Sequence, residues 1–189
     1  MDKKALIIKA SQILFAQFGL KKVTTDDIAR EGHISKATIY KYFKNKNEIF
    51  DAVIKDEIDQ LLAEIRAAID LKVEVPDKLK AHLMTRLGKV HEFANFYRVT
   101  YETWGDYWPH IAQFRKQFLK EEQEIVKNIL IQGIKRNELV INNVEMAAHV
   151  LIVALASLEF QWALDEYHIS LETMVDNMLE MMMHGIYRR

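Results

Sequence analysis

The stretch Thr24–Ile49, TTDDIAREGHISKATIYKYFKNKNEI, decides the fold of this chain. It predicts two short helices joined by a tight turn, followed by the start of a third and longer helix. Either Thr24 or Thr25 can cap the first helix, because a threonine hydroxyl can accept from the free N–H groups at a helix start. Asp26 and Asp27 then lie at the positively polarised end of that helix, where carboxylates are favoured.

The second helix of this stretch is short and exposes most of its side chains. Gly32 and His33 interrupt the chain before it, Ser35 is suited to cap it, and Ile39 is its expected buried anchor. A helix of this length buries little apolar surface by itself. Two helices joined in this way are typical of a helix-turn-helix, whose second helix enters the major groove of DNA.

The residues before this stretch complete a small domain. Apolar residues recur there at helical spacing, and Gly19 follows them as an expected helix end. The expected apolar face of this first helix is Leu6, Ile7, Ala10, Ile13, Leu14, Phe15, Ala16 and Phe18. Residues 2–45 therefore predict a three-helix domain with one small core.

Charge separates this segment from the remainder of the chain. Residues 1–50 hold ten Lys or Arg and five Asp or Glu, a net charge of +5, whereas the other 139 residues carry −6. The total of −1 conceals this division. A basic head on an acidic body is expected if only the head meets phosphate.

The remainder of the chain reads as helices throughout, so the expected fold class is all-α. Apolar spacing predicts one long helix over residues 46–71, which joins the N-terminal domain to the rest. We expect a helix-turn-helix domain at residues 1–46 and a helical ligand-binding and dimerisation domain at residues 47–189.

At residues 7–50 the chain resembles the DNA-binding domain of the TetR family of bacterial repressors. The resemblance covers about a quarter of the chain closely; beyond it, only length and helical character match. The residues that carry it are Ala10, Leu14, Phe15, Gly19, Thr24-Thr25, Ile28-Ala29, the run from Ser35 to Tyr40, Tyr42-Phe43 and Lys44-Asn45-Lys46.

The resemblance implies roles for particular residues. Three resemble the family's phosphate contacts: Thr25, Tyr40 and Lys46. Five occupy positions from which the family reaches bases or flanking phosphates: Lys36, Ala37, Thr38, Lys41 and Tyr42.

Two positions depart from the family's pattern. His33 stands where the family usually has glycine in the turn, and histidine tolerates the left-handed conformation better than most residues. Asp26 stands where some members carry a polar or basic base-reading residue, and we interpret it as a cap.

Aromatic residues concentrate between Phe93 and Phe118, which hold nine of the chain's nineteen. They form two stripes at helical spacing, and such groups line small-molecule sites. An ordinary packed core would show the same stripes. The family resemblance implies an inducer site among these middle helices. The candidate ligand-binding residues are Phe93, Tyr97, Tyr101, Trp104, Trp108, Phe114 and Trp162.

The two C-terminal helices predict a dimer interface. The helix expected over residues 144–167 is apolar nearly all round, so it needs cover on two sides. Together with the last helix, it resembles the family's dimerising four-helix bundle. The candidate interface residues are Leu151, Leu155, Leu158, Met178 and Met182.

These features predict a transcriptional repressor that binds palindromic operator DNA as a homodimer and is released by a largely apolar small molecule. Activation in place of repression fits the same residues. The alternative is a small helical enzyme or lipid-binding protein with an incidental basic end. We expect no catalytic residue, cofactor or metal site, since no Gly-rich phosphate loop, nucleophile elbow or ligand set is evident. The absence of cysteine, export signal and apolar span predicts a cytoplasmic protein that does not enter the membrane.

Overall fold

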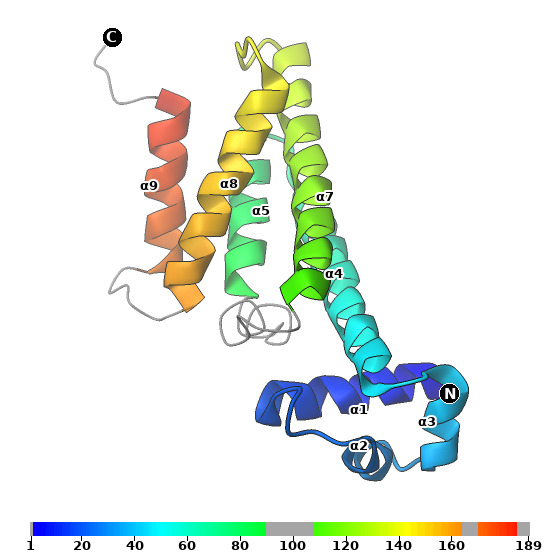
Figure 1. The fold of residues 1–189 in the computed structure, drawn as a ribbon. Coiled ribbons are helices and arrows are strands. Elements are labelled where there is room, and N and C mark those ends of the chain that lie inside the picture. Colours follow the sequence, from blue (N-terminus) through cyan, green and yellow to red (C-terminus); the bar gives the residue numbers. More distant parts are fainter. Residues whose placement is uncertain (1, 90–107, 164–169, 185–189) are drawn as a thin grey trace. The chain divides into compact units, whose positions relative to one another are not determined.

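The computed structural model describes residues 2–89, 108–163 and 170–184, with side chains except at 108–110, 157–163 and 184. These parts of the chain contain helices and no strand, which confirms the predicted all-α class (Figure 1). The helices are Lys3–Phe18 (α1), Thr25–Glu31 (α2), Lys36–Tyr42 (α3), Lys46–Asp70 (α4), Val75–Gly88 (α5), Trp108–Lys135 (α7), Val144–Ala163 (α8) and Leu171–His184 (α9). No helix among the described residues is long and apolar enough to cross a membrane.

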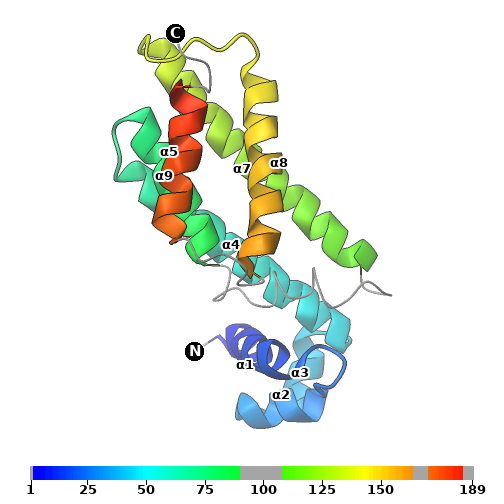
Figure 2. The same ribbon diagram turned by 90° about the vertical axis from the view of Figure 1, so that its left-hand side faces the viewer.

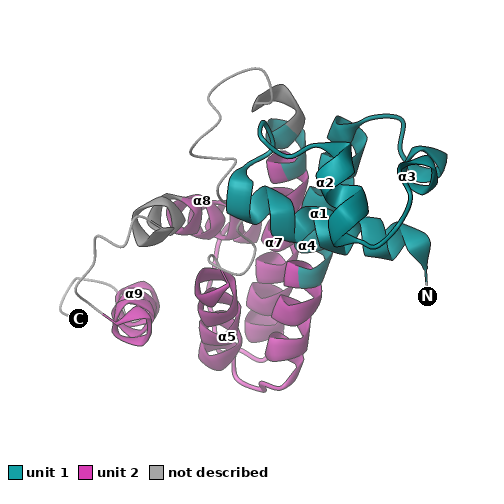
Figure 3. Ribbon diagram, turned by 90° about the horizontal axis from the view of Figure 1, so that it is seen from below, with its two compact units in different colours: residues 1–60, 93–114 teal, residues 61–92, 115–189 magenta. Residues whose placement is uncertain are grey.

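The chain divides into two compact units (Figure 3). Unit 1 comprises residues 1–60 and 93–114, and unit 2 comprises residues 61–92 and 115–189. Helix α4 runs without interruption past the boundary at residue 60, so one helix belongs to both units.

Helices α1, α2 and α3 and the first part of α4 surround the core of unit 1 (Figure 2). The rings of Phe15 and Phe50 meet edge to face, with centroids 5.4 Å apart. The other buried apolar side chains of this core include Ile7, Leu14, Val23, Ile28, Ile39, Phe43, Ile49 and Val53. The prediction of a buried apolar face was wrong for two residues of α1, because Ile13 and Phe18 are 48% and 50% exposed. The buried face of α1 is narrower than the full set of its apolar residues.

The turn between α2 and α3 adopts the conformation expected of it. His33 takes a positive φ of 49°, in the left-handed region that histidine tolerates better than most residues. Gly32 precedes it with an ordinary φ of −77°. A Cβ atom on Gly32 would lie 3.5 Å from the Cβ of Ala10 and 3.2 Å from the carbonyl oxygen of Ile28. The contact with Ala10 is an ordinary van der Waals distance, whereas the one with Ile28 is tight, so glycine at position 32 relieves crowding against the end of α2.

Unit 2 consists of the second part of α4 with α5, α7, α8 and α9. Helices α5 and α9 lie side by side, and Lys80 of α5 joins them through Asp176 at 2.6 Å and Glu172 at 3.3 Å (Figures 1 and 2). The buried apolar side chains of this unit include Leu61, Ile65, Leu79, Leu83, Leu87, Phe118, Val126, Ile129, Ile152, Leu155, Val175 and Leu179.

A charged cluster lies inside the core of unit 2. Arg86 of α5 pairs with Glu122 of α7, and both side chains are fully buried. His82, one turn before Arg86, places its Nε2 atom 3.2 Å from the same carboxylate. The guanidinium of Arg86 also lies 5.2 Å from the centre of the Phe118 ring. These contacts tie α5 to α7 through buried charges.

Candidate functional site

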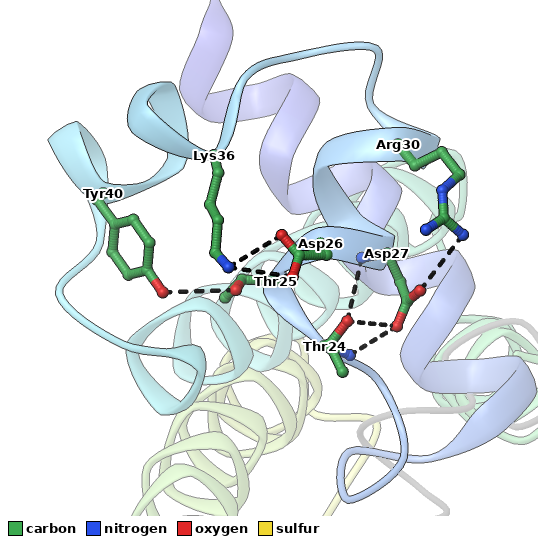
Figure 4. Close-up of polar contacts among 7 residues, drawn as sticks. All are labelled: Thr24, Thr25, Asp26, Asp27, Arg30, Lys36 and Tyr40. Carbon is green, nitrogen blue, oxygen red and sulfur yellow. Dashed lines mark hydrogen bonds and ion pairs between the residues drawn. The ribbon is translucent and has the colours of Figure 1, made fainter.

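The N-terminus of α2 carries a complete capping box. The Thr24 hydroxyl accepts from the backbone N–H of Asp27 at 3.2 Å, and the Asp27 carboxylate accepts from the Thr24 backbone at 2.9 Å and the Thr24 hydroxyl at 2.6 Å (Figure 4). These bonds lower the pKa of Asp27. The interpretation of Asp26 as a cap is therefore wrong, because Asp27 fills that role.

Helix α3 exposes most of its surface, as predicted. Ser35 caps it by accepting from the backbone N–H of Thr38 at 3.1 Å, and Ile39 is its buried anchor. Tyr40 and Tyr42 are half exposed. Lys36, Ala37 and Lys41 are also exposed, and Thr38 is half-buried. The helix thus presents a mixed surface of lysine, tyrosine and small side chains.

Two contacts join the exposed side of α3 to the start of α2 (Figure 4). The hydroxyls of Thr25 and Tyr40 lie 3.4 Å apart. The ammonium of Lys36 lies 3.0 Å from both carboxylate oxygens of Asp26. This contact raises the pKa of Lys36. Residues separated by ten or more positions in the sequence therefore form one polar surface.

Lys46 directs its side chain into unit 1. Its ammonium donates to the carbonyl oxygens of Leu20 and Val23, each at 2.7 Å, and lies 3.4 Å from that of Lys21. Burial lowers the pKa of this ammonium. Periodicity and charge gave no sign of this arrangement, since its partners are backbone atoms more than twenty residues away.

The start of α4 is capped by side chains as expected, with one difference of detail. Asn45 accepts from the backbone N–H of Glu48 at 3.0 Å. The Glu48 carboxylate accepts a hydrogen bond from the backbone N–H of Lys44 at 2.8 Å. In a capping box the donor would be the N–H of the next residue, Asn45.

The predicted ligand-binding residues fall largely outside the described part of the chain. Phe93, Tyr97, Tyr101 and Trp104 lie outside the described residues, as do the side chains of Trp108 and Trp162. Phe114 is half-buried on α7.

A narrow apolar cavity lies beside the buried charges in the described part of unit 2. Its volume of about 20 Å³ admits about one water-sized molecule. Its walls are Leu79, His82, Leu83, Val126, Leu151, Ile152, Leu155, Met178, Leu179 and Met182.

The predicted interface residues occupy different depths. Leu155 is buried within its own chain, Leu151 and Met178 are half-buried, and Met182 is exposed. The side chain of Leu158 lies outside the described residues.

The exposed apolar face of α8 is formed instead by Met146, Val150 and Val153. An open groove of about 780 Å³ runs between α8, α9 and the segment before α8. The side chains along it include Val140, Met146, Val150, Leu151, Met182 and Met183.

Where the structure describes side chains, no three His, Asp or Glu residues are grouped so that they could hold a metal ion.

Known proteins resemble this chain both in its N-terminal helix-turn-helix region and over most of its length. Residues 7–53 match the family model described as bacterial regulatory proteins, tetR family. The uncharacterized HTH-type transcriptional regulator YhgD of Bacillus subtilis (strain 168) is 28% identical over 167 residues, covering 86% of this chain and 85% of that protein. The fatty acid metabolism regulator protein of the same strain is 23% identical over 184 residues, covering 97% and 95%.

A solved structure extends the likeness of fold to nearly the full length. The transcriptional regulator FadR from Bacillus subtilis, in complex with stearoyl-CoA, superposes with a TM-score of 0.76 at 22% identity, covering 97% of this chain and 99% of that chain. The helix-turn-helix geometry, the family match and the relatives agree. Residues 7–53 therefore carry a helix-turn-helix of the tetR family type, and most of the chain is similar to transcriptional regulators.

Proposed function

We propose that this protein is a homodimeric repressor that binds a palindromic operator and is released by a long-chain acyl thioester. The observation that carries the proposal is the exposed surface of α3, where Lys36, Tyr40 and Lys41 stand outward from a helix anchored by Ile39. Lysine and tyrosine suit contacts with phosphates and base edges, and a helix of this length fits the major groove.

The start of α2 supports a second set of contacts. Thr25 lies on the first turn of α2. Its hydroxyl lies within 3.4 Å of Tyr40 on α3. We infer that these two hydroxyls contact one phosphate, which would fix the depth and direction of α3 in the groove.

The homodimer rests on the apolar groove and on the exposed face of α8. Met146, Val150 and Val153 repeat at intervals of four and three residues, so they form one stripe, and each is at least half exposed. A contiguous apolar surface of this kind marks an interaction site. A second copy of the chain, related by a two-fold axis, would cover the same stripe on both subunits.

In the core of unit 2 the described cavity of about 20 Å³ is too small for an acyl chain, so the choice of an acyl effector rests on the relative of similar fold. The narrow cavity there is walled almost entirely by apolar side chains, and Met178 and Met182 adapt readily to a ligand's shape. The relative of similar fold was solved with stearoyl-CoA. The ligand-binding role of Phe93, Tyr97, Tyr101, Trp104, Trp108, Phe114 and Trp162 stays a prediction from the sequence. The effector releases DNA by binding the released state of the protein more tightly than the DNA-binding state. To change the ratio of released to DNA-binding protein from 1:99 to 99:1, this difference in binding free energy must be about 5.5 kcal/mol.

Selection of duplexes from a random-sequence library by the full-length protein tests the proposal. We expect a two-fold symmetric consensus, two chains per duplex, and release of the selected duplex by stearoyl-CoA but not by free coenzyme A. Selection of no duplex by the protein, together with turnover or transport of an acyl compound, would instead favour a helical enzyme or lipid carrier. A selected duplex that stearoyl-CoA does not release would remove the acyl effector and leave the DNA-binding role.

A further inference from the structure

The ion pair between Asp26 and Lys36 joins the first turn of α2 to the first residue of α3. The ammonium lies 3.0 Å from each carboxylate oxygen, so it sits across the carboxylate and not at one end of it. The side chains are 62% and 48% exposed. Figure 4 shows this pair beside the contact of Thr25 with Tyr40, on the same side of unit 1.

Neither partner is needed to start its own helix. Thr24 and Asp27 cap α2, and Ser35 caps α3. An exposed pair of this kind contributes little to stability, since water screens both charges. The carboxylate of Asp26 also repels phosphate. If this surface bound only the DNA backbone, Asp26 would weaken its affinity for DNA.

The pair offers a cationic donor and an anionic acceptor about one hydrogen bond apart. A G·C base pair presents the complementary pattern in the major groove. Guanine offers two acceptors, O6 and N7, and the neighbouring cytosine offers the N4 amino donor. Lysine is suited to the guanine acceptors, and an aspartate is suited to the cytosine amino group. An A·T pair places an amino donor next to N7, where it would repel the ammonium.

We propose that Asp26 and Lys36 together read a single G·C base pair, with Lys36 donating to guanine and Asp26 accepting from the cytosine amino group. This inference rests on the proposed DNA-binding function. The pair is formed before DNA arrives, so neither side chain has to be ordered separately on binding. Exchange of the G·C pair would leave at least one charge facing a mismatched edge.

The test compares duplex selection by the full-length wild type, Asp26→Asn, Lys36→Met and the double variant. We expect one G·C column in the wild-type consensus to lose its preference in both single variants, with all other columns kept. Replacing that base pair by A·T should weaken wild-type binding roughly 5- to 150-fold and each single variant about twofold or less. The double variant should lose no further discrimination, because one shared contact can be removed only once.

The control is a second exposed ion pair in unit 1, Lys55 with Asp59, which lies on α4 at 2.5 Å. Asp59→Asn and Lys55→Met make the same charge changes and should leave every column intact. Far-UV circular dichroism and thermal melts should show that all variants fold, since the helix caps are untouched.

Two results separate the inference from the function beneath it. If Asp26→Asn tightens binding to the selected duplex and to random duplexes alike, with an unchanged consensus, then Asp26 acts only as a repulsive charge and the inference is overturned. A loss of preference at different columns in the two single variants would overturn it as well. If the wild type enriches no sequence at all, the proposed function itself fails.

Discussion

The ammonium nitrogen of Lys46 lies 2.7 Å from the carbonyl oxygen of Val23. Val23 immediately precedes Thr24, the N-cap of α2, and Lys46 is the first residue of α4. A second bond of the same length reaches the carbonyl of Leu20. The first turn of α4 therefore holds the segment that leads into α2. A movement of α4 would displace this segment and, with it, the contact between Thr25 and Tyr40.

This relationship predicts an unusual response to substitution. Lys46→Met should lower the stability of unit 1 by about 1–3 kcal/mol, because it removes charge-assisted hydrogen bonds. DNA binding should weaken through displacement of the α2 segment, while the slope of log K against log salt stays unchanged. Urea unfolding and fluorescence anisotropy at several salt concentrations measure the two effects.

Lys41→Met is the matched control for Lys46→Met. Its side chain is exposed on α3, so its loss should leave stability unchanged and reduce the salt slope by about two units, one for each head of a dimer. A Lys46→Met variant that behaves in this way, with normal stability, would mean that Lys46 contacts phosphate directly, as the family resemblance implies.

The capping box predicts a pH dependence. Hydrogen bonds from Thr24 lower the folded-state pKa of Asp27, so its contribution to stability is complete above the unfolded value of about 3.9. The contribution is lost as the pH falls through that value toward the lower folded pKa. Asp27→Asn should therefore destabilise the protein at pH 7, and the difference from wild type should shrink below about pH 4. Urea unfolding at pH 7, 4 and 3 checks this, and a difference that stays constant with pH would argue against a role for the charge.

The two-fold interface can be tested on the exposed face of α8. Val150→Glu places a carboxylate in the groove without disturbing the core, whereas the same change at buried Leu155 would unfold the chain. The dimer should weaken roughly 30-fold or more, since each subunit would bury an unpaired polar group. Analytical ultracentrifugation measures this. Val73→Glu changes a 64% exposed valine outside the groove and should remain dimeric. If the Val150→Glu protein stays a tight dimer, the interface lies on another surface.

The buried charges of unit 2 predict a large asymmetry between single and double substitutions. Arg86→Met leaves the Glu122 carboxylate in the core without its guanidinium partner, which should cost about 3–5 kcal/mol of unfolding free energy. Arg86→Met combined with Glu122→Leu removes both charges and should recover a large part of that loss. Urea unfolding of the three proteins gives the values. Additive losses in the double variant would contradict a direct coupling of the two side chains.

The local features of the head could be predicted because they depend on neighbouring residues. The caps at Thr24 and Ser35, the turn at His33 and the break after α1 are set by short-range hydrogen bonds and by backbone preference. Residues 36–42 were expected to form an exposed helix anchored by Ile39, and the structure bears this out. The interpretation of Asp26 as a cap was wrong, because Asp27 forms the capping box with Thr24. The sequence alone does not distinguish two adjacent aspartates in one helical turn.

The long-range contacts could not be predicted in the same way. Lys46 donates to carbonyl groups in a loop more than twenty residues earlier, and Arg86 of α5 pairs with Glu122 of α7. A lysine at a helix start, or an arginine between Thr85 and Leu87, has no sequence pattern that identifies such a partner. The same limit explains Ile13 and Phe18, whose helical spacing fits the core although both side chains are exposed.

Protection of guanine N7 from dimethyl sulfate tests the central claim most directly, because N7 lies in the major groove where α3 is expected to bind. The full-length protein, bound to its selected duplex, should protect guanines in two half-sites whose centres lie about 34–36 Å apart on one face of the DNA. Lys36→Met should restore methylation of one guanine in each half-site. Full reactivity of every guanine N7 in a complex that is otherwise tight and specific would contradict the docking of α3 in the major groove.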